Sequence, residues 1–180
     1  MRGMFRRLSL SINCITIKTD ELNGVCAMIN VESLKQICLF KGLSDEDLKK
    51  VASAVKEKFY PKGTIIWEED SVEQGLQIIE RGKVRVTKRT KESKRQMLAM
   101  LREGKFFGEL SLLDGRNHSA ELEAVDDTKV LVISRADMAR FLEEDPQIAY
   151  TIVREIAIDI SKILREMNER FMGMVNYIWH

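Results

Sequence analysis

The residues best suited to chemistry lie in segment 104–120, which begins Gly-Lys-Phe-Phe-Gly-Glu-Leu-Ser-Leu-Leu-Asp-Gly. Gly108 has no side chain, so the main chain there can come close to a ligand and adopt unusual dihedral angles. Residues 109–113 predict one short helical turn, whose first N–H groups have no partner inside the helix and would point at an anion. The Ser119 hydroxyl and the Ala120 N–H can add two donors. This pattern indicates the binding of a small anion such as a phosphate.

Catalysis finds little support in the chain. The two histidines are His118 and His180, and no grouping of a nucleophile, a histidine and an acid is evident. No phosphate loop and no metal-binding pair appears, so we expect a protein that is not an enzyme and requires no cofactor or metal. The cysteines, Cys14, Cys26 and Cys38, are odd in number and have no short-spaced pair. That argues against a disulfide framework and for a reducing, cytoplasmic compartment.

Length, charge and hydropathy narrow the function classes further. The chain has 180 residues, of which 44% are hydrophobic and 32% charged, which suits one packed domain with a modest extension. Its 29 Lys and Arg residues nearly balance 28 Asp and Glu residues, so binding to nucleic acid or an anionic membrane would need a local patch. No uncharged apolar run approaches the roughly 20 residues that span a bilayer. We therefore expect neither DNA nor a membrane as a partner.

The first 58 residues predict an arm followed by helices. Residues 1–30 mix arginines with polar and apolar residues and predict a loosely docked N-terminal arm; Met28 is an alternative start, so it stays open whether residues 1–27 belong to the mature protein. Within 31–58, Ser44 precedes three acidic residues, as a helix cap does. Apolar residues then recur with the period of a helix that buries one face, at Leu48, Val51, Ala52 and Val55.

Residues 59–134 predict short strands separated by turns. Segments 76–79 and 84–87 predict a hairpin around the turn at 80–82, and 88–95 predicts a charged loop. Many short strands at near-regular spacing favour an antiparallel barrel or jelly roll over a parallel sheet.

Residues 135–180 predict two helices. Ser134 caps a short one that carries Met138, Phe141 and Leu142, and Pro146 marks the first position of a second, long one. Apolar residues in the long helix then alternate between spacings of four and three, which is a heptad seam, at Ala149, Val153, Ile156, Ile160, Ile163 and Met167. We expect this helix to pack both on its own domain and on a partner.

The order of these elements resembles the cyclic nucleotide-binding domain, the β-roll shared by catabolite activator-type regulators, cyclic nucleotide-dependent kinases and gated channels. The resemblance covers roughly residues 34–172, and segment 104–120 resembles the family's phosphate-binding cassette. Turn glycines match at Gly63, Gly82 and Gly104. The resemblance implies a mainly β fold, an antiparallel β-roll or jelly roll (a cupin-like double-stranded β-helix) with N-terminal helices and a long C-terminal helix.

The implied organisation is an uncertain arm over 1–30, a β-roll domain over 31–145 and a helix over 146–180 for dimerisation and signal output. The residues expected to bind cAMP or cGMP are Gly108, Glu109, Leu110, Ser111, Arg116, His118, Ser119 and Ala120. By resemblance Glu109 accepts a hydrogen bond from the ribose 2′-hydroxyl; the alternative is a carboxylate that caps its own helical turn. The side chains expected to be core residues that seat this turn are Leu110, Leu112 and Leu113.

His118 departs from the family pattern. The family usually has Arg at this position, paired with the cyclic phosphate through two hydrogen bonds. A neutral imidazole lacks the permanent charge and the planar fork of a guanidinium. Losing one charge-assisted hydrogen bond costs about 1.5–3 kcal/mol, or one to two decades in affinity. Arg116 compensates if it points inward; the alternative is a solvated loop charge. A second departure is Glu69-Asp70, where the family often has Gly-Asp.

Three functional hypotheses follow. The first is a regulatory module that senses a cyclic nucleotide and relays the signal through helix 146–172 of a homodimer to an unknown downstream protein. The second is a degenerate domain that dimerises or binds proteins without a ligand. A DNA-binding regulator is rejected, because the residues from 173 to 180 cannot supply a helix-turn-helix unit. A haem-sensing variant, with His118 and the cysteines as candidate ligands, is a further alternative.

Overall fold

The computed structural model describes residues 29–178, apart from positions 73, 91 and 93. The arm expected over 1–30 lies almost wholly outside these residues, as do Cys14, Cys26 and His180. The strands are β1 (Lys56–Tyr60), β2 (Ile65–Trp67), β3 (Leu76–Arg81), β4 (Lys83–Arg89), β5 (Arg95–Arg102), β6 (Phe106–Phe107), β7 (Glu121–Ala124) and β8 (Thr128–Ile133). The helices are α1 (Val31–Lys35), the 3₁₀ helix η1 (Cys38–Phe40), α2 (Asp45–Ala54), α3 (Glu109–Asp114), α4 (Arg135–Glu144) and α5 (Pro146–Ile178).

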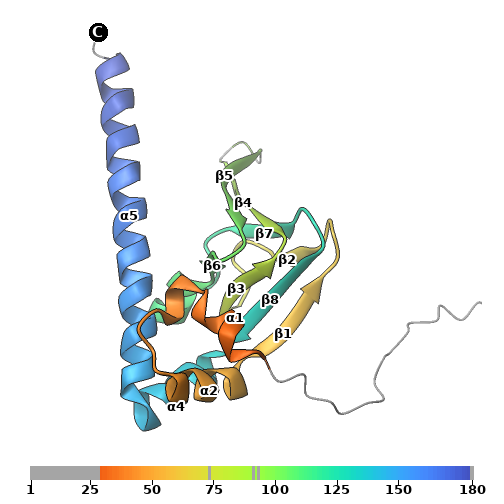
Figure 1. Ribbon diagram of the computed structural model, residues 1–180. Helices are drawn as coiled ribbons and strands as arrows, with labels where there is room; N and C mark the ends of the chain where they lie inside the picture. Colours follow the sequence, from red (N-terminus) through yellow and green to blue (C-terminus); the bar gives the residue numbers. More distant parts are fainter. Residues whose placement is uncertain (1–28, 73, 91, 93, 179–180) are drawn as a thin grey trace, which may run out of the picture.

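The strands form two four-stranded antiparallel sheets, in the orders β1-β8-β3-β6 and β2-β7-β4-β5 (Figure 1). The chain passes from one sheet to the other several times, as in a β-roll. The predicted fold class, an antiparallel roll with flanking helices and a long C-terminal helix, is confirmed.

The hairpin predicted around residues 80–82 is wrong. β3 pairs with β6 and β8, whereas β4 pairs with β5 and β7. Gly82 forms the corner between the two sheets, with φ at 105° and with the Asp127 carbonyl 2.8 Å from where a Cβ would stand. Such a corner admits no side chain without strain, so the glycine marks a crossing between sheets. The hairpin is formed by β4 and β5 instead, and part of the predicted 88–95 loop belongs to these strands.

Strands β3 and β8 of the sheet β1-β8-β3-β6 are buried on both faces, whereas most of β1 is exposed. On one face, Leu76, Ile78, Leu131 and Ile133 pack against the helices, and on the other, Ile79 and Val130 pack inside the roll. A strand covered on both sides must be apolar throughout, which explains the uninterrupted run at the end of β8.

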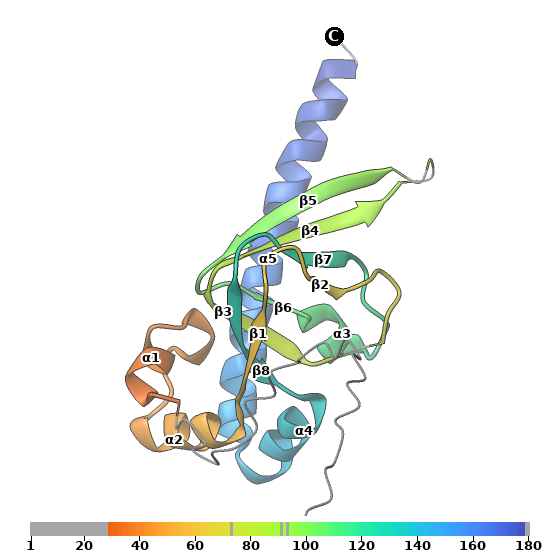
Figure 2. The same ribbon diagram turned by 90° about the vertical axis from the view of Figure 1, so that its right-hand side faces the viewer.

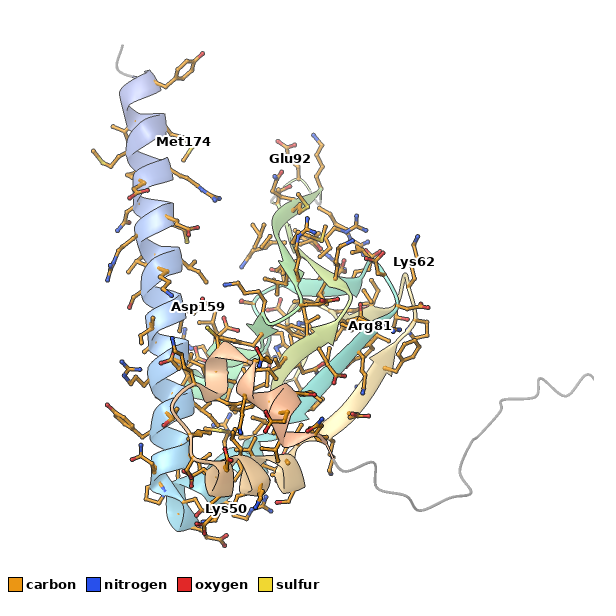
Figure 3. The ribbon with its side chains drawn as sticks, in the orientation of Figure 1. Lys50, Lys62, Arg81, Glu92, Asp159 and Met174 are labelled. Carbon is orange, nitrogen blue, oxygen red and sulfur yellow. The ribbon has the colours of Figure 1, made fainter. Side chains whose placement is uncertain are left out.

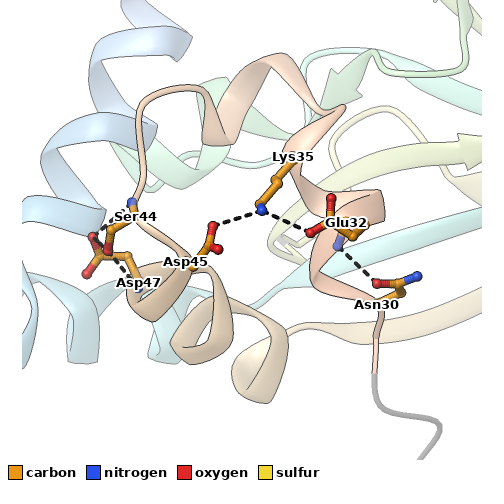
Figure 4. A network of polar contacts seen from close by, with 6 residues as sticks. All are labelled: Asn30, Glu32, Lys35, Ser44, Asp45 and Asp47. Carbon is orange, nitrogen blue, oxygen red and sulfur yellow. Dashed lines mark hydrogen bonds and ion pairs between the residues drawn. The ribbon is translucent and has the colours of Figure 1, made fainter.

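Helices α1 and α2 are held by local polar contacts (Figure 4). Ser44 caps α2 in a capping box with Asp47, as the sequence predicted, and Lys35 bridges Glu32 and Asp45 at 2.9 Å each. The helical stretch expected to continue to residue 58 is shorter. It ends at Ala54 because the following residues pair with β8 as strand β1.

Helix α5 is packed over its first part and extends past the roll over its second (Figures 1 and 2). Ile148, Ile152 and Ile156 are fully buried against the other helices, whereas Ile163 and Met167 are 47% and 60% exposed. Figure 3 shows Met174 far along the free portion. Within the described residues, no helix combines the length and hydropathy that a bilayer crossing requires.

The buried face of α5 gives a stability prediction. Ile152→Ala should lower the free energy of unfolding by about 2–5 kcal/mol, because it leaves a cavity in the core cluster that α5 shares with α4 and η1. Chemical denaturation measures it. Leu142→Ala, at a 60% exposed position of α4, is the control and should change stability by less than about 0.5 kcal/mol. Equal losses in both variants would contradict the assigned core.

Candidate functional site

The predicted cassette occupies one end of the roll and is fixed by a close main-chain approach. Gly108 has φ at 87° and precedes α3 directly. A Cβ at this position would lie 2.4 Å from the Gly75 carbonyl oxygen and 3.2 Å from the Trp67 ring. Because no side chain fits there, Gly108 lets α3 begin against the end of β2 and the loop before β3.

Glu109 begins α3 and is half-buried. Burial raises the pKa of its carboxyl above the ordinary value, a hydrogen bond from its own N–H lowers it, and the Asp159 carboxylate of α5 raises it. Asp159 is itself paired with Lys105, whose Nζ lies 3.3 Å from its Oδ1. The first residue of the predicted cassette helix thus faces α5 across a small charged cluster.

His118 is buried inside the roll, with only 2% of its surface exposed. Its ring stacks on the Trp67 indole, with centroids 3.7 Å apart and planes 3° from parallel, and its Nδ1 lies 3.2 Å from the Ser111 Oγ. Its main chain also bonds the 70–71 loop, since its N–H donates to the Ser71 carbonyl and its carbonyl accepts from the Asp70 N–H. The structure therefore brings His118 and Ser111 together, as expected of one site, but directs the imidazole to an aromatic neighbour.

Trp67 is the residue of this site that the sequence analysis assigned only to a strand. It is 4% exposed and also meets Phe107 edge-on, with ring centroids 5.1 Å apart. Its indole N–H has no hydrogen-bond partner among the described residues. An aromatic at the end of a strand gives no sequence signal for such a role, because its neighbour His118 is 51 positions away.

Arg116 lies apart from the other predicted site residues. Its side chain is 85% exposed, and its Nε lies 3.7 Å from Asp114. Of the two alternatives for this residue, the structure has the solvated loop charge.

Ser119 and Ala120 follow His118 directly, Ser119 exposed and Ala120 buried. The Ser119 carbonyl accepts a hydrogen bond of 3.1 Å from Nζ of Lys88, a residue that the sequence analysis placed in a solvated loop. This puts a cation beside the predicted cassette.

The expectation that three leucines of α3 are all core residues is wrong. Leu112 is 8% exposed and belongs to the core, whereas Leu110 and Leu113 are each 46% exposed. A helix that lies on the surface buries only one face, so neighbours one and two positions from Leu112 point outward. The exposed Leu110 side chain lies at the first turn, next to Glu109.

No group of three or more His, Cys, Asp or Glu side chains that could hold a metal ion occurs in the described part of the chain. Cys38 is an exposed free cysteine. Helix α5 is the last element of the described residues.

Three comparisons bear on this site. Residues 57–145 match the family model described as the cyclic nucleotide-binding domain. The chain is 33% identical over 119 residues to the cyclic AMP receptor protein of Thermus thermophilus, covering 66% of this chain and 55% of that protein. It is 32% identical over 104 residues to cGMP-dependent protein kinase 2 of Homo sapiens, covering 57% of this chain and 14% of the kinase. The chain thus spans about half of the first relative and a small part of the second.

Solved structures agree on the fold. The catabolite activator protein of Thermus thermophilus has a TM-score of 0.66 at 30% identity, covering 74% of this chain and 61% of that one. A cyclic nucleotide-binding domain from Methylobacillus flagellatus has a TM-score of 0.71 at 24% identity, covering 79% of this chain and 80% of that one. These matches confirm the roll and the family resemblance; the roles of single cassette residues stay predictions.

The raised pKa of Glu109 predicts a pH-dependent stability. Because the folded state takes up the carboxyl proton at a higher pH than the unfolded chain, ionised Glu109 costs stability above its folded pKa. That cost disappears as the pH falls towards the ordinary value of about 4.5. Glu109→Gln should therefore melt at a higher temperature than the wild type at pH 7.5, with a gap that narrows near pH 4.5.

Calorimetry at the two pH values measures this gap. Glu143→Gln, at an exposed position of α4, is the control and should show no such pH dependence. A Glu109→Gln protein that is less stable at pH 7.5 than the wild type would contradict the prediction.

Proposed function

Because residues 57–145 belong to the cyclic nucleotide-binding domain family, we propose that this chain is a regulatory module that binds cAMP or cGMP at segment 108–120. The single observation that carries the proposal is the family match across a segment whose main chain curls at Gly108 against Gly75 and Trp67. Among the relatives, one is named as a cyclic AMP receptor and another as a cGMP-dependent kinase, which supports a cyclic nucleotide without choosing its base.

In this proposal each cassette residue makes a different contact with the nucleotide. Gly108 brings the main chain close to the cyclic phosphate, and the N–H groups of Leu110 and Ser111 at the start of α3 are directed outward from its first turn. Glu109 accepts a hydrogen bond from the ribose 2′-hydroxyl with one of its carboxylate oxygens. Ser119 donates its hydroxyl to the phosphate, with the Ala120 N–H beside it.

In this proposal, ligand binding at the cassette is transmitted to helix α5. Glu109 lies close enough to Asp159 for the two carboxylates to repel each other, and Asp159 is paired with Lys105 from the turn before β6. A ligand that changes the surroundings of Glu109 therefore changes the electrostatic balance at the middle of α5. This contact supports a relay from the cassette to the long helix.

A second function is favoured by the position of the two candidate cations. The His118 ring is buried against Trp67, and the Arg116 side chain points to solvent. The alternative is a degenerate member of the family that acts without a ligand, as a dimerising or protein-interaction module. The binding experiment below distinguishes the two functions.

Binding is tested by titrating the protein with cAMP and with cGMP in a calorimeter. Under the first function the wild type binds at least one of them. His118→Arg should bind about ten- to a hundredfold more tightly, because one charge-assisted hydrogen bond to phosphate is restored. Arg116→Gln, the control, should leave affinity unchanged because its side chain is in solvent. Absence of heat with both nucleotides in the wild type and in a folded His118→Arg variant would overturn the first function.

For dimerisation we propose the free portion of α5 as the contact, with a second copy of the chain as its occupant. The seam that is buried on the domain at Ile156 continues, with alternating spacings of three and four, into exposed Ile163 and Met167. A heptad seam that leaves its own domain is complementary to another such helix. Exposed Met174 extends the same apolar face.

If α5 forms the dimer contact, one substitution in its seam should halve the mass of the protein in solution. Light scattering after gel filtration should give twice the chain mass for the wild type and the chain mass for Met167→Asp, because a carboxylate in the seam would be desolvated. Asn168→Asp adds the same charge one position off the seam and should stay dimeric. A monomeric wild type at micromolar concentration would contradict the proposed contact.

A further inference from the structure

The cassette segment 108–120 is bordered by few cations that could neutralise a phosphate. Arg116 is exposed and lies beside Asp114, and Lys105 is paired with Asp159 of α5. Arg135 packs its guanidinium beside Gly115, at the end of α3 away from Gly108. None of these three is directed at Ser119, where the proposed function places the phosphate.

Lys88, unlike these three residues, is directed at Ser119. Val84 and Val86 of β4 pack into the roll interior, and Lys88 lies two residues further along the same strand, on the same face. Its Nζ donates to the Ser119 carbonyl at 3.1 Å, while half of its side chain remains exposed. The ammonium therefore stands at the mouth of the roll, next to the main chain of Ser119.

Glu69 keeps Lys88 in place. Its Oε1 lies 3.7 Å from the Lys88 Nζ, and its Oε2 accepts the Arg89 N–H at 3.1 Å. The nearby acid Glu121 is engaged elsewhere, since it accepts from Arg95 and Thr87. Among the residues that the structure describes, Lys88 thus has one weak carboxylate partner, at a distance longer than a good charged hydrogen bond.

We propose that Lys88 is the phosphate-pairing cation of this chain, acting from β4 in place of the arginine that the cassette lacks at position 118. The inference rests on the proposed function, and it names the residue that supplies the charge. On binding, the anion replaces the Glu69 carboxylate as the partner of Lys88. No covalent change and no movement of the strand is needed, because a lysine side chain has the freedom to turn its ammonium from one oxygen to another.

Whereas Lys88 strengthens nucleotide binding in this arrangement, Glu69 weakens it. It holds Lys88 beside Ser119 in the free protein, but it also competes with the phosphate for the ammonium. This competition predicts that Lys88→Gln lowers the affinity for the nucleotide and that Glu69→Gln raises it. Loss of structure would lower the affinity in both variants. Lys88 pairs in a half-exposed position, so its contribution should weaken as salt screens it.

The experiment titrates cAMP and cGMP into the wild type, Lys88→Gln, Glu69→Gln and Lys94→Gln at low and at high sodium chloride. Lys88→Gln should weaken binding roughly three- to tenfold at low salt and less at high salt. Glu69→Gln should tighten binding, since glutamine still accepts the Arg89 N–H without the competing charge. Lys94→Gln removes an equal charge from the exposed β4–β5 turn and should have no effect.

Three results would overturn the inference, and only the last of them also overturns the proposed function. If the wild type binds and Lys88→Gln binds equally well, Lys88 has no role and the proposed function stands. If the wild type does not bind, the same pair of substitutions is compared in the His118→Arg protein, where an unchanged affinity rejects Lys88. If neither background binds either nucleotide, the proposed function fails and Lys88 fails with it.

Discussion

The close approach of Gly108 to the Gly75 carbonyl and the Trp67 ring is the constraint on which the candidate site depends. It fixes where α3 begins, and through α3 it sets the positions of Glu109 and Ser111. Ser111 in turn touches His118, which stacks on the same Trp67 ring. One glycine without room for a side chain therefore joins β2, α3 and the segment before β7 into a single rigid corner.

Within that corner the replacement of an arginine by His118 changes where charge resides. An imidazole is flat and, when neutral, can be buried against an indole, whereas a guanidinium must keep its hydrogen bonds or an anion. The inner end of the site is consequently aromatic, with Trp67, Phe107 and His118 in contact. Positive charge is found at the outer end, on Lys88, where it is partly balanced by Glu69.

Helix α5 connects this corner to the rest of the molecule. Its first turns close the helical core, its middle faces Glu109 through Asp159, and its free portion carries an apolar seam. In the proposed function, a change at Glu109 and the contact of α5 with its proposed partner therefore act on one continuous helix. The single helix gives the proposed sensor a short physical path between ligand and output, with no intermediate element.

The local sequence was sufficient for the features that depend on neighbouring residues. Ser44 and Ser134 predicted the caps of α2 and α4, and the spacing of apolar residues in α5 predicted a long amphipathic helix. Tertiary structure decided which strands pair, because Gly82 permits either a hairpin or a corner and only packing against Asp127 and Thr128 selects the corner. It also decided the site, since Trp67, Lys88 and His118 come from β2, β4 and the segment before β7. Residues so far apart in the chain come together only when β2 and β4 pair with β7 in one sheet, and no local pattern encodes that pairing.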